Sequence, residues 1–293
     1  MKKNLLIFAA IFALTVPVFS SCNKSGDDNK KDSKEVVMKD GTTKSTAKVV
    51  KFDKTLPPKY KDPNGSYDIK KMEFTEDGMC MIDRQLVTRA DIGDIISEVF
   101  GYTVSGNTYT IIGFGTVVIS GNSVTVTFDS GGEGGTFEAT ITPTSTSTVD
   151  ENNMARTWKV SSVMLNVSGN GVSIKKTFNG CNLEEIGKYA ADNGVSGLSK
   201  HLNDLKGYIV DYVIFTGADT FIITFTGANA IAGTFKLQAN NKLNYNLPEG
   251  NPFFHGSSTG DFEFPADKKT TIKLNITVEG YTGYVEMSLT AAN

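Results

Sequence analysis

Residues 271–278 read Thr-Ile-Lys-Leu-Asn-Ile-Thr-Val, and their alternation decides the class of fold. The apolar side chains all fall on one side of an extended chain: Ile272, Leu274, Ile276 and Val278. A period of two residues is typical of a strand with one buried face. The segment therefore predicts an antiparallel strand whose apolar side lies against a core.

The same alternation recurs along the chain from residue 66 onward. It is clearest in four further segments: 124–128, 221–225, 243–247 and 285–289. Turn-forming residues lie between such segments, at Gly106-Asn107, Gly121-Asn122, Asn240-Asn241 and Gly280. Many short strands separated by turns are typical of barrels and sandwiches. The fold class predicted is therefore mainly β, with antiparallel barrel-like or sandwich-like domains.

Short helical insertions are expected between the strands. In residues 88–101, a potential N-cap at Thr88 precedes isoleucines and a valine at helical spacing, and a glycine follows. A second helix is expected to begin at Asn182, with Glu185 three residues later, and to end at Gly194. A third would cover residues 198–207, where leucines recur at helical spacing before Gly207.

The N-terminus has the composition of an export signal. Lys2 and Lys3 precede an apolar run, 5–19, that is short for a membrane-spanning helix but ordinary for a signal peptide. Two serines then precede Cys22. This order resembles a bacterial lipobox, although Phe19 stands where leucine is commonest. The resemblance implies cleavage before Cys22 and acylation of that cysteine; the alternative is an ordinary secretory signal with an incidental cysteine.

A polar, charged stretch follows Cys22 and reads as a solvated tether. Asp27 and Asp28 lie early in it. Such an acidic cluster resembles the export signal of Bacteroidetes surface lipoproteins, and so implies an outer-membrane protein displayed at the cell surface. The alternative is a charged linker without a targeting role.

Domain boundaries follow from these changes of composition. Residues 1–21 are interpreted as the signal peptide and 22–62 as the tether. The low-complexity Ser/Thr stretch after Pro143 places a boundary near residue 150. The expected domains are therefore a β-rich one over 63–149 and a second over 150–293.

Charge is distributed unevenly along the chain, which has 29 Lys and Arg and 32 Asp and Glu in all. Residues 23–62 contain 11 lysines and 7 acidic residues, a net charge of +4. Without these and the two lysines of the signal, 16 basic and 25 acidic residues remain, a net charge of −9. Nucleic acid is therefore not an expected partner, because phosphate contacts need clustered basic residues. The basic tether is suited to lipid headgroups, although a solvated spacer explains it equally well.

Cys80 and Cys181 are the other two cysteines. An exported protein can join them in a disulfide, but two separate buried thiols are the preferred interpretation. The cysteines and the two histidines, His201 and His255, are not at metal-binding spacing. No metal or other cofactor is therefore expected.

The second half resembles a known kind of domain. A lone Trp158 on an early strand is followed by a helical segment, a Phe-Thr…Phe strand over 215–221 and a Gly-Thr-Phe strand at 233–235. This order resembles the lipocalin-like domains of uncharacterised Bacteroidetes lipoproteins. The resemblance implies a small antiparallel barrel with Trp158 closing one end, and it carries no activity.

Residues expected to bind a ligand are few. Phe253, Phe254 and His255 follow one another in a Gly/Pro-rich segment, and two adjacent aromatics cannot both point inward from an extended chain. One ring exposed at a barrel mouth would suit a sugar or an apolar ligand. Trp158 is a further candidate. The alternatives are two rings folded onto the barrel end and a simple core tryptophan.

Catalytic motifs are weak. Residues 256–260 match the pattern G-x-S-x-G, but neither the strand before nor the helix after that a nucleophile elbow needs is expected. We therefore predict a non-enzymatic accessory lipoprotein that binds a glycan, a small apolar ligand or an envelope protein. Two alternatives remain: a structural component of an envelope complex, and a carboxylate-dependent hydrolase.

Overall fold

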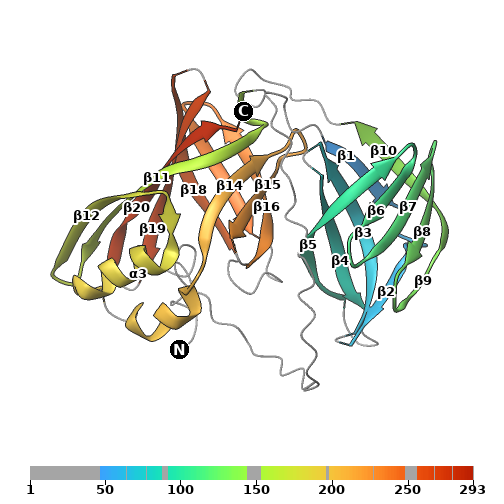
Figure 1. Ribbon diagram of the computed structural model, residues 1–293, viewed down its shortest axis with the longest axis horizontal. Helices are drawn as coiled ribbons and strands as arrows, with labels where there is room; N and C mark the ends of the chain where they lie inside the picture. Colours follow the sequence, from blue (N-terminus) through green and yellow to red (C-terminus); the bar gives the residue numbers. More distant parts are fainter. Residues whose placement is uncertain are drawn as a thin grey trace.

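A computed structural model describes residues 47–292 except 64, 77, 88–91, 144–152, 196–197, 227, 248–255, 267 and 279. These residues form two antiparallel β-barrels that lie side by side (Figure 1). Each barrel closes through a ring of eight strands. The mainly β fold predicted from the alternation is confirmed, and the barrels are consistent with a lipocalin-like fold.

The first barrel contains ten strands, and the pairing of β1 with β3 closes its ring. Its strands are β1 (Ala47–Phe52), β2 (Lys59–Asp62), β3 (Gly65–Thr75), β4 (Met79–Val87), β5 (Ile92–Ser105), β6 (Thr108–Ile111), β7 (Gly115–Ser120), β8 (Ser123–Phe128), β9 (Gly132–Glu133) and β10 (Gly135–Pro143). The short β2 and β9 lie outside the ring. The interior is filled by apolar side chains, among them Ile69, Met72 and Val117, which are fully buried.

The second barrel closes by pairing of β11 with β14. Its strands are β11 (Thr157–Gly169), β12 (Val172–Asn179), β13 (Cys181–Asn182), β14 (Ile209–Phe215), β15 (Thr220–Thr226), β16 (Ala228–Gln238), β17 (Lys242–Leu247), β18 (Gly256–Ala266), β19 (Lys269–Val278) and β20 (Tyr281–Ala291). Residues 271–278 lie in β19, and Ile272 is in the core as predicted. The turn between β16 and β17 has Asn240 and Asn241 at φ of 60° and 58°, which asparagine tolerates well.

Two of the three expected helices are present, at one end of the second barrel (Figure 1). Helix α3 (Leu183–Asp192) begins after Asn182, whose side chain accepts a hydrogen bond from the backbone N–H of Glu185. Residues Leu198–Leu205 form the 3₁₀ helix η1. Among the described residues, no helix has the length and apolarity needed to cross a membrane.

The prediction of a helix over residues 88–101 is wrong where the structure describes them, because β5 occupies Ile92–Ser105. The error has a physical cause. Phe100 packs on the first core, whereas Val99 packs against an apolar cluster outside the barrel. A strand that buries parts of both faces has apolar residues at irregular intervals, and here these intervals imitate helical spacing.

The first barrel also begins earlier than the boundary predicted at residue 63. Strands β1 and β2 lie within the segment interpreted as tether, and they pair with β3. Val50 and Phe52 are buried in the core, while Lys51 between them is exposed. This strand pattern was missed because the many lysines of the segment are also typical of a solvated linker.

The barrels contact each other through the outer faces of two groups of strands, β3–β5 and β14–β16 (Figure 1). The apolar part of this interface, here called the interface cluster, consists of Met79, Met81, Ile214, Ile222 and Ala232. All five are buried. The interface therefore explains why β4 and β15 are buried on both faces rather than on one.

Candidate functional site

A hollow of about 370 Å³ lies on the second barrel, over neighbouring strands β16, β17 and β18. Its volume is at the lower end of the range of small-molecule pockets, about 300–1,000 Å³. It is lined by Thr234, Phe235, Lys236, Asn244, Tyr245, Asn246 and Thr259. We call this site the β16–β18 hollow.

Alternation along the strands places the polar lining residues on the outside of the barrel. Phe235 and Leu243 are buried in the core, so the residues next to them point the other way. Thr234 lies opposite Asn246, and Asn244 lies opposite both Lys236 and Thr259. Residues paired across strands share a face, so these side chains form two adjacent polar rows.

The chemistry of the hollow is polar with little charge. Asn244 and Asn246 each have an amide that both donates and accepts hydrogen bonds, and Thr234 and Thr259 contribute hydroxyls. Among the described residues that line it, Lys236 alone is charged. The Asn275 amide extends the row by donating to Thr259 Oγ1 over 3.4 Å. Such a surface suits a ligand that has many hydroxyl groups and no strong charge.

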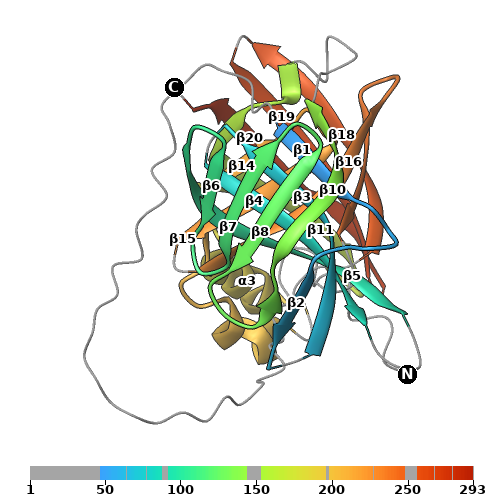
Figure 2. The same ribbon diagram turned by 90° about the vertical axis from the view of Figure 1, so that its right-hand side faces the viewer.

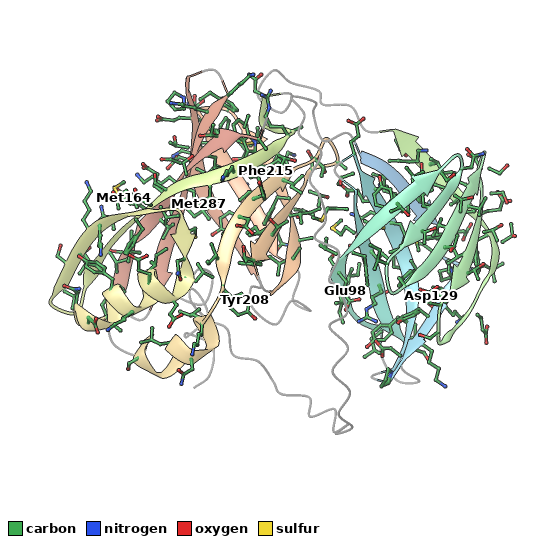
Figure 3. All side chains as sticks on the ribbon, viewed as in Figure 1. Glu98, Asp129, Met164, Tyr208, Phe215 and Met287 are labelled. Atoms are coloured by element: carbon green, nitrogen blue, oxygen red, sulfur yellow. The ribbon has the colours of Figure 1, made fainter. Side chains whose placement is uncertain are left out.

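The carboxyl groups with raised pKa lie elsewhere. Burial raises the pKa of Glu98, although the neighbouring Arg84 opposes this. Glu98 is on β5, at the lower end of the first barrel in Figure 3. Arg84 donates to Glu98 Oε1 and to Asp62 Oδ2, both over 2.7 Å, and its guanidinium lies 4.2 Å from the ring centroid of Tyr67. The Arg84 side chain is therefore buried between two carboxyl groups and an aromatic ring.

Glu73 has a raised pKa for the same reason, burial, partly opposed by Lys71. It is fully buried on the outer face of the first barrel. Thr216 and Thr220 of the second barrel donate hydrogen bonds to its two oxygens over 2.7 and 2.9 Å. Neither Glu73 nor Glu98 borders the β16–β18 hollow, and the described residues contain no group of three or more potential metal ligands.

Trp158, a residue predicted to bind a ligand, lies in the core of the second barrel and is 1% exposed. Its indole N–H donates to the backbone oxygen of Met154 over 2.8 Å, and the Arg156 guanidinium lies 5.4 Å from the ring. The polar edge of the indole is thus bonded within the protein. Direct ligand binding by Trp158 stays a prediction, and it would require the ring to become accessible.

The other predicted site residues, Cys22, Phe253, Phe254 and His255, lie outside the described residues. The last three belong to the segment that joins β17 to β18, two strands of the hollow. Cys80 and Cys181 are both buried free thiols, as preferred from the sequence. Burial raises the pKa of the Cys181 thiol to about 12.

The residues of the hollow were not singled out from the sequence. The alternation of 243–247 already placed Asn244 and Asn246 on the exposed side of a strand. It gave no means of knowing that Thr234 and Thr259 would lie beside them, because strand neighbours are not encoded in a local pattern.

A comparison of the chain with models of protein families found no match, and a comparison with curated proteins found none either. The case for a function therefore rests on the geometry of the hollow and on the N-terminal sequence.

Proposed function

We propose that this chain is a lipid-anchored envelope protein that binds a hydroxyl-rich ligand, such as a glycan, without transforming it. The observation that carries the proposal is the lining of the β16–β18 hollow, where amides and hydroxyls lie side by side and none of the described lining residues is acidic. Glycan hydroxyls need partners that both donate and accept, as asparagine and threonine do. Glycoside hydrolysis needs two carboxyl groups at the bond, and the described residues of this lining do not supply them.

The location follows from the N-terminus. A signal-like run before Cys22 resembles that of bacterial lipoproteins, and the early Asp27-Asp28 pair resembles a surface-export signal. The anchor would be acyl groups on Cys22, and two or more chains hold a protein stably to a membrane. We propose the outer membrane of a Bacteroidetes-type cell, with the barrels on the outside.

The binding test is a glycan array probed with the wild-type chain and with Asn244→Ala/Asn246→Ala. We expect loss of at least tenfold in affinity, because each amide contributes hydrogen bonds that water replaces only in part. Thr127→Ala, on the far side of the first barrel, is the matched control and should bind as the wild type does. Equal binding by the double variant would remove the hollow from the proposal.

Phe253 and Phe254 extend the same test into the segment between β17 and β18. We expect Phe253→Ala and Phe254→Ala to weaken glycan binding severalfold without changing the melting temperature, since an aromatic face stacks on the apolar side of a sugar. Unchanged affinity in both variants would limit the site to the strands.

A second candidate function, a component of an envelope assembly, is favoured by a different surface. The outer face of β6–β8 points away from the second barrel (Figure 2). The residues paired across it are uncharged: Thr108, Thr110, Thr116, Val118, Thr125 and Thr127. Val118→Lys should then reduce cross-linking to a partner in whole cells, whereas Asn244→Ala/Asn246→Ala should not.

A further inference from the structure

The loop between β1 and β2 exposes an apolar side chain. Leu56 is 76% exposed, the highest value among the large apolar residues described. In contrast, Pro57 and Pro58, which follow it, are buried. An exposed leucine forgoes the free energy of burial. If the backbone around Leu56 is held in place, its exposure therefore suggests that it contacts a partner.

The loop backbone is indeed fixed at both ends. The Asp53 N–H donates to the backbone oxygen of Glu138, and the Pro58 oxygen accepts from the N–H of Ile69. Within the loop, Asp53 Oδ1 accepts from both the backbone N–H and the hydroxyl of Thr55, over 2.7 and 2.6 Å. Leu56 therefore lies in solvent on a loop whose two ends are hydrogen-bonded to the barrel.

Lysines flank this leucine along the chain on both sides. Lys51, Lys54, Lys59 and Lys61 are all exposed. Among the described residues, Lys51, Lys54 and Lys61 form no ion pair, and Lys59 lies 3.8 Å from Asp68. Asp68 is itself paired with Lys70 over 2.9 Å. The acidic residues near these lysines include Asp53 in the loop, Glu133 opposite Lys59 on β9, and the exposed Glu138, whose backbone oxygen accepts from the Asp53 N–H.

The position in the chain identifies the partner. The loop follows the segment 23–46, which would join the barrel to the lipidated cysteine and which spans at most roughly 80 Å when fully extended. A membrane that holds Cys22 is thus always within reach of the loop. The charge of the chain is also polarised, since five lysines face two aspartates in residues 47–62, whereas the residues after 62 have the net charge of −9 derived above.

We propose that the β1–β2 loop is a second membrane contact, in which Leu56 enters the lipid interface and the surrounding lysines lie over anionic phosphate headgroups. Cationic side chains beside an inserted apolar one are the physical requirements of interfacial binding. The acidic remainder of the molecule is repelled by the same surface, so the contact fixes which side of the first barrel faces the membrane. The inference rests on the proposed function for the anchor that brings the loop to the lipid.

The test uses the mature chain from residue 22 with Cys22→Ser, so that no acyl group contributes. Binding is measured by flotation with vesicles of equimolar phosphatidylglycerol and phosphatidylcholine, and with vesicles of phosphatidylcholine alone. We expect binding to the anionic vesicles that weakens with added salt. Lys54→Ala/Lys61→Ala should lower it about 25-fold, at about fivefold for each lysine removed. Leu56→Asp should lower it at least fivefold.

Two control variants show whether any loss of vesicle binding is specific to the β1–β2 loop, or follows from removing any lysine or any exposed apolar residue. Lys175→Ala removes an exposed lysine from the second barrel, and Ile112→Asp changes another exposed aliphatic residue, so both should bind as the parent chain does. Equal binding of the parent and the loop variants, or no preference for anionic vesicles, would overturn the inference. Failure of the anchor would be seen separately, as an unacylated Cys22 in the wild-type chain.

Discussion

Glu73 of the first barrel is hydrogen-bonded to two threonines of the second barrel. A fully buried carboxylate costs free energy unless it is hydrogen-bonded and paired. Its hydrogen bonds come from Thr216 and Thr220, 143 and 147 residues away in sequence. Lys71 lies 3.6 Å from Glu73 and 3.1 Å from Asp83. The pair of barrels thus depends on a polar contact in the middle of an apolar interface.

The raised pKa of Glu73 makes stability depend on pH. Because the folded chain holds this proton to a higher pH than the unfolded chain, the free energy of unfolding falls as pH rises from about 4.5 through the folded pKa. We expect Glu73→Gln to lack this contribution. The melting temperature of the wild type minus that of the variant should therefore decrease with rising pH, and thermal scans across pH 4 to 8 test this. A constant difference would contradict the buried carboxylate.

The burial of single residues shows which contacts a local sequence pattern predicts and which it does not. Ile272 and Phe221 were placed on the apolar side of their strands, and both are in the core. Ile222 lies on the opposite face from Phe221, and the alternation does not predict that this face is also buried, here against the first barrel. The alternation of apolar residues shows which face of a strand lies against the core of its own barrel. Whether the other face packs against a second barrel depends on tertiary packing, which a local pattern does not contain.

At the scale of elements, local signals identified α3 and failed for β5. The Asn182 cap acts within one turn of helix, so its signal lies entirely in adjacent residues. The burial of β5 comes from two different partners, and no local window contains both. The same limit applies to the β16–β18 hollow, whose polar rows exist only after three strands have paired.

The cap provides a prediction for α3. Asn182→Ala should lower the free energy of unfolding by about 0.5–2 kcal/mol, because the N–H of Glu185 loses its acceptor. Lys188→Ala, which removes the exposed ion pair with Asp192 on the same helix, should change it by less than about 1 kcal/mol. Urea denaturation measures both. A cap variant as stable as the Lys188 variant would show that α3 is held by packing alone.

At the scale of the whole molecule, the interface cluster joins the barrels into one unit. Ile222→Ala should destabilise it by about 2–5 kcal/mol, since the side chain is fully buried between the barrels. Ile112→Ala, at a position 51% exposed, should change stability by less than about 0.5 kcal/mol. Calorimetry of the wild type should show one transition. Two wild-type transitions, with Ile222→Ala shifting only one, would mean that the barrels unfold independently.

We propose that this two-barrel unit is displayed on a lipid anchor, and the decisive observation is whether Cys22 is acylated. The measurement is mass spectrometry of the N-terminal peptide of the chain purified from its native cells. We expect a peptide that begins at Cys22 and has the added mass of acyl groups, and a Cys22→Ser variant that stays uncleaved. A mature chain that begins at another residue, or an unmodified Cys22, would contradict it.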